Sequence, residues 1–139
     1  MRFLAFVLLF GTAYLSLAAA VSALASSRRS AIALGLLALL VGVLGGDLAI
    51  LRSLAGGMSP EEIAGAITLT PNGAFRGLIF EHVIGVAFTP DGRFVQTSRA
   101  VGSLVVWILA GIAVAVTTLT YAARVDVVVE RARERFGEY

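Results

Sequence analysis

The sequence predicts a mainly α-helical membrane protein: three transmembrane helices, a small extramembrane β-meander with a short helix between the second and third, and a C-terminal juxtamembrane helix. Composition is the first ground, because 58% of the residues are hydrophobic, 14% are charged and the mean hydropathy is +0.92, more than the core of a soluble domain requires. Long uncharged runs are the second ground, and a strand-like alternation between the last two runs is the third. A chain of 139 residues has room for three spans of about 20 residues each.

Cysteine content and charge exclude several classes of site. The chain has no cysteine, which rules out disulfides, thiolate metal sites and cysteine-bound haem or iron–sulfur clusters. Its formal net charge of +2 is small and scattered along the sequence, whereas a nucleic-acid-binding face needs a basic stripe. We therefore expect no cofactor and no nucleic-acid partner.

The first predicted span covers residues 3–25, which hold no charged residue. A helix of this length is about 34 Å long and can cross a hydrocarbon core. The competing interpretation is a cleaved secretory signal, because Arg2 precedes the run and Ala23–Ala25 resembles a small-residue cleavage site. The run is longer than a usual signal core, so we expect it to be retained. Small residues at four-residue spacing give this helix a face suited to close packing, and they are Thr12, Ser16 and Ala20.

A short polar connection, Ser26–Ser30, separates the first span from a second apolar run at residues 31–51. So short a link fits only an antiparallel hairpin, and residues 1–51 are therefore expected to form one transmembrane unit. The second run carries the small-xxx-small pattern that lets two helices approach closely in a bilayer. The residues of this stripe are Ala38, Gly42 and Gly46.

Arginines in the hairpin turn predict the orientation of the chain. Arg28 and Arg29 lie in this turn, and arginines in short loops stay on the cytoplasmic side of a membrane. The N-terminus and residues 52–99 are then expected outside, and the C-terminus in the cytoplasm. The expected location is the cell membrane of a prokaryote.

Asp47 is the only acidic residue within the three predicted spans, and it has two interpretations. As a functional group it would bind a proton or a cation, or pair with an arginine of a partner inside the membrane. Otherwise it is an interfacial residue about one turn from the end of the span, solvated or near Arg52. We favour the interfacial interpretation, because a proton relay needs a second ionisable group at depth and the three predicted spans supply none.

Residues 52–99 are expected to form the extramembrane segment. Ser59, Pro60 and Glu62 have the spacing of a capping box with proline at the first helical position. This pattern predicts a short helix over residues 60–66.

The rest of this segment contains a small repeat, Thr70–Phe75 and Thr89–Phe94, which we interpret as two hairpin turns. Between the turns, residues 78–88 alternate with the two-residue period of a strand. The expected meander has strands near residues 67–70, 74–89 and 93–98. So small a sheet cannot bury a core of its own, and we expect it to be supported by a membrane surface, by helix ends or by another protein.

Titratable residues of this segment allow two chemical interpretations, both weak. His82 would need Glu81, Asp91 or Glu61 to hold a metal, and a single imidazole without a fixed second ligand makes a poor site. We therefore expect a histidine packed or hydrogen-bonded beside its strand. Glu61 and Glu62 resemble an acid pair for hydrolysis, but helix capping already accounts for them.

The third predicted span covers residues 100–123, which carry no charge and contain a small pair, Gly111 and Ala115. Residues 124–139 are expected to continue as an amphipathic helix with one apolar stripe. That stripe consists of Val125, Val128, Ala132 and Phe136. It either rests on lipid headgroups or forms a docking face for a partner.

Catalysis is not expected from this sequence. It has no nucleophile with a base, no phosphate-binding glycine loop before a helix and no cluster of metal ligands. We expect an accessory subunit of a larger membrane complex, respiratory, secretory or transport. Three features favour it: each span has a face of small residues, the sheet cannot bury a core of its own, and the tail has an apolar stripe. The expected partners of this subunit are the lipid bilayer and other membrane subunits. The alternatives are a self-assembling subunit, pilin-like or homo-oligomeric, and a small ion- or proton-conducting oligomer that uses Asp47.

Overall fold

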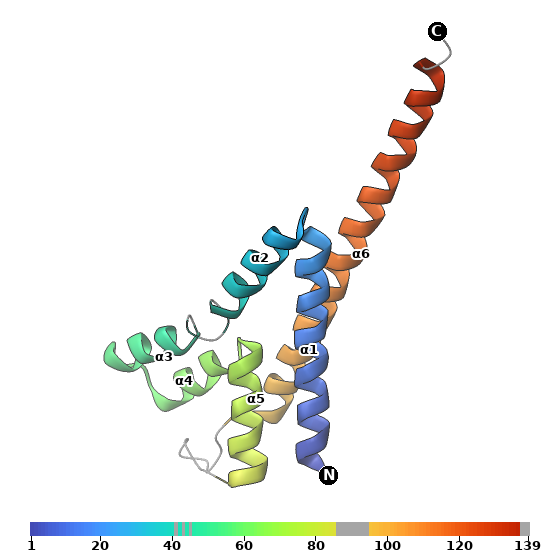
Figure 1. The fold of residues 1–139 in the computed structure, drawn as a ribbon. Helices are drawn as coiled ribbons and strands as arrows, with labels where there is room; N and C mark the ends of the chain where they lie inside the picture. Colours follow the sequence, from blue (N-terminus) through green and yellow to red (C-terminus); the bar gives the residue numbers. More distant parts are fainter. Residues whose placement is uncertain (41, 43, 45, 86–94, 137–139) are drawn as a thin grey trace.

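The structure, a computed structural model, describes residues 1–40, 42, 44, 46–85 and 95–136. The described elements are all helical: α1 (Arg2–Leu24), α2 (Arg28–Leu40), α3 (Gly46–Ala55), α4 (Pro60–Ile67), α5 (Pro71–Ile79), the π-helix η2 (Phe80–Ile84) and α6 (Thr97–Phe136). Helices α1 and α6 pack side by side and run in the same direction, and α5 lies against both (Figure 1). Helices α2 and α3 extend away from this bundle of α1, α5 and α6.

Two helices of the described chain, α1 and the Thr97–Ala122 part of α6, are long and apolar enough to cross a membrane. The sequence predicted three. Residues 31–51 do not form one continuous α-helix, because α2 ends at Leu40 and α3 begins at Gly46. The described residues between these two helices, Gly42 and Leu44, are π-helical, and the glycines at positions 42, 45 and 46 disfavour a regular α-helix.

The predicted β-meander is wrong, since no described residue lies in a strand. The sequence from Thr70 to Gly73 caps a helix instead of closing a hairpin: the Thr70 hydroxyl accepts a hydrogen bond from the Gly73 N–H at 3.1 Å, and Pro71 takes the first helical position. Residues 74–84 then continue as α5 and η2. The second copy of the repeat, Thr89–Phe94, lies outside the described residues.

The capping box at α4 is confirmed. The Ser59 N–H donates to Glu62 Oε2 at 2.8 Å, and the Glu62 N–H donates to Ser59 Oγ at 3.3 Å. These reciprocal bonds satisfy two amides that the first turn leaves without helical partners. The helix extends over Pro60–Ile67, one residue beyond the predicted end.

Acid should loosen the start of α4. The hydrogen bond from the Ser59 backbone, and secondly that from its side chain, lower the pKa of Glu62. A carboxyl with a depressed folded-state pKa stabilises the fold above its unfolded pKa, and this stabilisation is lost as the pH falls through the folded value. We expect hydrogen-exchange protection of the α4 amides to fall across the acidic range, and Glu62→Gln to remove this dependence. Glu61→Gln, outside the box, should retain the wild-type profile; an unchanged profile in Glu62→Gln would contradict the assignment.

The core lies where α1, α5 and α6 meet. Its buried residues are Ala13, Ala74, Leu78, Val95, Ala100 and Leu104. The Phe10 and Phe75 rings stack at 4.3 Å between centroids, and the Phe6 and His82 rings stack at 5.5 Å. Because Phe75 pairs with Phe10 and His82 with Phe6, α5 and η2 run antiparallel to the first half of α1. Part of the segment predicted to be extramembrane therefore lies alongside the first predicted span.

Close approach of α1 and α6 depends on a glycine. A Cβ atom at Gly111 would lie 2.7 Å from the Ser16 carbonyl carbon and 2.8 Å from its oxygen, which is too near for any side chain. The Ser16 hydroxyl, buried in this contact, donates to the Ala13 carbonyl at 2.8 Å. The two helices thus meet backbone to backbone, as small residues permit in membrane proteins.

Candidate functional site

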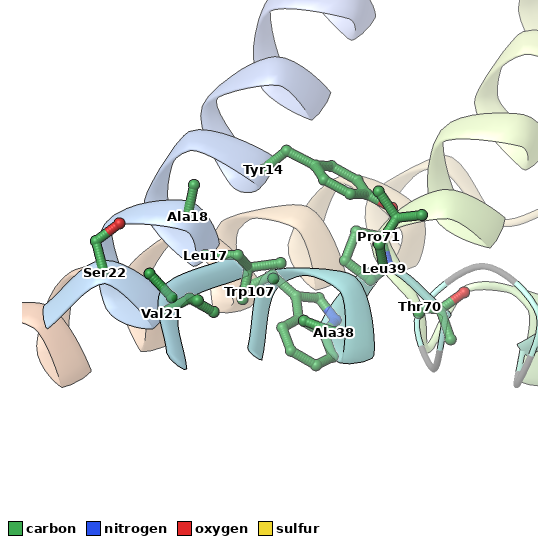
Figure 2. A pocket seen from close by; sticks show the side chains of 13 residues that line it. Tyr14, Leu17, Ala18, Val21, Ser22, Ala38, Leu39, Thr70, Pro71 and Trp107 are labelled. Carbon is green, nitrogen blue, oxygen red and sulfur yellow. The ribbon is translucent and has the colours of Figure 1, made fainter. Parts of the chain in front are cut away.

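A cavity of about 580 Å³ opens between α1 and α2 (Figure 2). Its lining is mostly aliphatic, with a tyrosine, a tryptophan and two hydroxyl side chains. The lining residues are Tyr14, Leu17, Ala18, Val21 and Ser22 of α1, Ala31, Gly35, Ala38 and Leu39 of α2, and Gly42, Thr70, Pro71 and Trp107. Such a cavity falls in the size range of ligand pockets and suits an apolar ligand.

The cavity exists because α2 diverges from α1 beyond their connecting turn. The Ser30 hydroxyl donates to the Ser27 carbonyl at 2.8 Å, which fixes the start of α2. No residue of α2 is buried. A Cβ atom at Gly35 or at Gly42 would meet nothing within 4 Å, so the small face of α2 borders space instead of touching α1.

The floor of the cavity is the junction between α4 and α5. The Trp107 indole Nε1–H donates to the Leu69 carbonyl at 2.9 Å, and the buried Thr68 hydroxyl donates to the Gly65 carbonyl at 2.8 Å. On the other side of the junction, a Cβ atom at Gly46 would lie 3.3 Å from Thr70 Cγ2. The starts of α3 and α5 therefore lie at the level of Trp107, near the middle of the apolar part of α6.

The predicted packing residues fall into three groups. Ser16, Ala20, Gly111 and Ala115 are buried residues of α1 and α6, whereas Ala38 and Gly42 line the cavity and Gly46 abuts Thr70. Thr12 is exposed, and its hydroxyl donates to the Leu8 carbonyl at 2.8 Å. The sequence reasoning missed Ala13, which is fully buried. The three-residue step from Ala13 to Ser16, also compatible with one helix face, was the available signal.

Asp47 forms an ion pair inside the chain, with Arg76 of α5 and not with Arg52. The Arg76 Nη1 atom lies 2.8 Å from Asp47 Oδ1. The three predicted spans offer no second ionisable group, and Arg76 belongs to the segment predicted to lie outside. The pair joins the first turn of α3 to α5.

This ion pair is expected to contribute little to stability. Its side chains are 50% and 39% exposed, and double-mutant cycles on exposed pairs give about 0.2–1 kcal/mol. We expect a coupling energy in this range between Asp47→Asn and Arg76→Gln when unfolding is followed in detergent. The pair Asp47→Asn and Arg52→Gln is the matched control and should show no coupling; equal coupling in both pairs would contradict the geometry.

His82 has partners that fit a structural role. Its Nε2 atom lies 2.7 Å from the Thr97 hydroxyl, and its ring stacks on Phe6. Glu81 Oε2 accepts a hydrogen bond from the Val95 N–H at 3.4 Å. Within the described part of the chain, no group of three or more His, Cys, Asp or Glu residues could hold a metal ion. Asp91 lies outside the described residues.

The predicted docking stripe of the tail belongs to α6, which continues to Phe136. The side chains of Val125, Val128, Ala132 and Phe136 lie outside the part of the structure that is described.

Comparison of the chain with protein-family models, with curated proteins and with solved structures finds no match. The function of the chain is therefore inferred from its geometry alone. The cavity offers apolar walls and hydroxyl groups. Of its lining residues, none is an acid, a histidine or a basic residue.

Proposed function

We propose that this chain is a non-catalytic integral membrane protein that serves as an accessory subunit of a larger membrane complex. Membrane insertion is supported by the surface of its two long helices, of which only 17% of each apolar window is buried. Leu8 and Leu15 of α1 and Leu109 and Leu119 of α6 are 60–73% exposed. Exposed apolar surface of this extent is typical of membrane or protein contacts.

Helix α2 carries the proposal of a partner. None of its residues is buried. Outside the cavity lining it presents Ile32, Leu36, Leu37 and Leu40, each at least half exposed, an apolar surface that suits a neighbouring membrane helix.

The described residues just beyond α2 are also open to a partner: Gly42 is half-buried and Leu44 is 52% exposed. A helix of 13 residues is about 20 Å long and cannot cross a core of about 30 Å by itself. A neighbouring membrane subunit would supply the missing cover.

The test is purification of the tagged chain from its native membrane in mild detergent, followed by mass determination and identification of bound proteins. We expect other membrane proteins in the complex. Copies of this chain alone would instead support the self-assembling alternative, and a monomer would overturn the proposal. Leu40→Trp, at the end of α2, exposed and not among the residues that line the cavity, should release the partner. Leu109→Trp, equally apolar and exposed on α6, should retain it.

A further inference from the structure

We infer that the cavity between α1 and α2 holds one acyl chain of an anionic phospholipid, whose phosphate lies at Arg28 and Arg29. The inference rests on the membrane placement proposed above, and it does not depend on a protein partner.

The length of the cavity covers most of one leaflet of a bilayer. Its lining residues extend from Ala31 to Leu39 on α2 and from Tyr14 to Ser22 on α1, a helical rise of about 12 Å on each. Half of a hydrocarbon core measures about 15 Å. The upper end adjoins the α1–α2 turn, and the floor is formed by Thr70, Pro71 and Trp107, midway along the apolar part of α6. An acyl chain entering beside the turn would therefore end at this floor.

The volume of the cavity favours an acyl chain over a helix. A helix with its side chains is about 10–12 Å wide and rises about 5.4 Å per turn, so each turn fills more than about 400 Å³. A cavity of about 580 Å³ has space for little more than one turn, and a crossing helix would leave most of its length outside. A single hydrocarbon chain is narrow enough to follow the whole slot.

The walls of the cavity suit hydrocarbon along this length. Small residues such as Ala18, Gly35 and Ala38 provide width, while Leu17 and Val21 provide apolar contact. An empty apolar slot forfeits the dispersion contacts of its lining. In a bilayer, the nearest molecules able to restore them are the acyl chains of lipids.

Charge at the upper end selects the headgroup. Arg28 and Arg29 open α2, three and two residues before the first α2 residue of the cavity, and both are exposed. Neither forms an ion pair within the described part of the chain. Arginines at a membrane surface attract anionic headgroups, so a phosphate bearing a net negative charge fits the entrance better than a zwitterionic headgroup.

Trp107 provides the test, because it is the only tryptophan in the chain and it lines the cavity. The full chain is reconstituted into phosphatidylcholine vesicles that contain a small fraction of phosphatidylglycerol brominated near the chain ends. Quenching of Trp107 fluorescence is compared with that by the same fraction of brominated phosphatidylcholine. We expect the anionic lipid to quench Trp107 more strongly than the zwitterionic lipid does. Each of Arg28→Gln and Arg29→Gln should reduce the relative affinity for the anionic lipid about fivefold.

Filling the cavity is the decisive variant. Gly35→Leu places a side chain where nothing lies within 4 Å of the new Cβ atom, and leucine favours a helix more than glycine does. We expect it to abolish the selective quenching. Ala33→Leu, on the same helix but not among the lining residues, should leave it unchanged.

Each outcome of this experiment counts for or against the lipid site. Equal quenching by both lipids, or selective quenching that survives Gly35→Leu, would show only bulk lipid around Trp107 and would overturn the inference. Loss of selectivity in Ala33→Leu would do the same. Vesicle flotation is measured first: a chain that does not float contradicts the membrane placement itself, whereas a chain that floats without selective quenching contradicts the lipid site alone.

Discussion

Gly111→Ala is expected to lower the free energy of unfolding by about 2 kcal/mol, in the range measured for overpacked cores. The new methyl group would lie 2.7 Å from the Ser16 carbonyl carbon, so α1 and α6 must separate along their contact. A flexible side chain could turn away, but here the obstacle is backbone. Equilibrium unfolding in detergent, followed by circular dichroism, gives the measurement.

The matched control for this prediction is on the same helix. A Cβ atom at Gly102 would meet nothing within 4 Å, and alanine exceeds glycine in helix propensity by about 1 kcal/mol. Gly102→Ala should therefore be neutral or stabilising. If both variants lost stability equally, the close approach of α1 to α6 would not be the cause.

Gly73→Ala is expected to cost about 3 kcal/mol or more, because its Cβ atom would collide with the Ile67 carbonyl and severe destabilisation accompanies backbone clashes of this kind. The α4–α5 junction would have to open, which would separate the Leu69 carbonyl from the Trp107 indole. We expect a lower unfolding midpoint and a shift in the Trp107 emission maximum. Both are measured on one sample in detergent.

Gly35→Ala serves as the control for the junction. Its Cβ atom meets no neighbour, and the substitution removes a helix-destabilising glycine from α2. Stability should rise or stay constant, with no shift in emission. A Gly73→Ala protein with wild-type stability and wild-type emission would contradict the geometry of the junction.

Two local patterns predicted local structure correctly in this chain, the uncharged runs and the capping box. The uncharged run at residues 3–25 is α1 with ends displaced by one residue, and the capping box at Ser59 starts α4 as expected. Both features depend on nearest neighbours along the chain. The uncharged run at residues 100–123 likewise lies within α6.

The β-meander failed because Thr-Pro-Asn-Gly is ambiguous. Proline, asparagine and glycine favour a tight turn, but threonine followed by proline is also a helix start. What decides between them is tertiary: Phe75 stacks on Phe10, and Leu78 enters the core formed with α1 and α6. These contacts join residues distant in sequence, so periodicity within residues 74–89 could not reveal them. Because no described residue lies in a strand, the predicted sheet gives no support for a partner.

The sequence predicted some residues of the cavity wall but not the cavity itself. The sequence showed that residues 31–51 carry a small face and that glycines interrupt the run before Asp47. It could not show that α2 diverges from α1, because that angle depends on the short turn and on contacts of α3 with the α4–α5 junction. Trp107, Tyr14 and Thr70 enter the site from three other elements.

The shared direction of α1 and α6 has a consequence for biosynthesis. Two long helices with the same direction require the chain to travel back between them, and here the return is divided: α2 descends from the first turn, and α5 with η2 completes the passage beside the start of α1. This second part, α5 with η2, packs on α6, which leaves the ribosome after α5. In ribosome-bound intermediates that stop before Thr97, α5 should therefore be able to pack on α1 but not yet on α6.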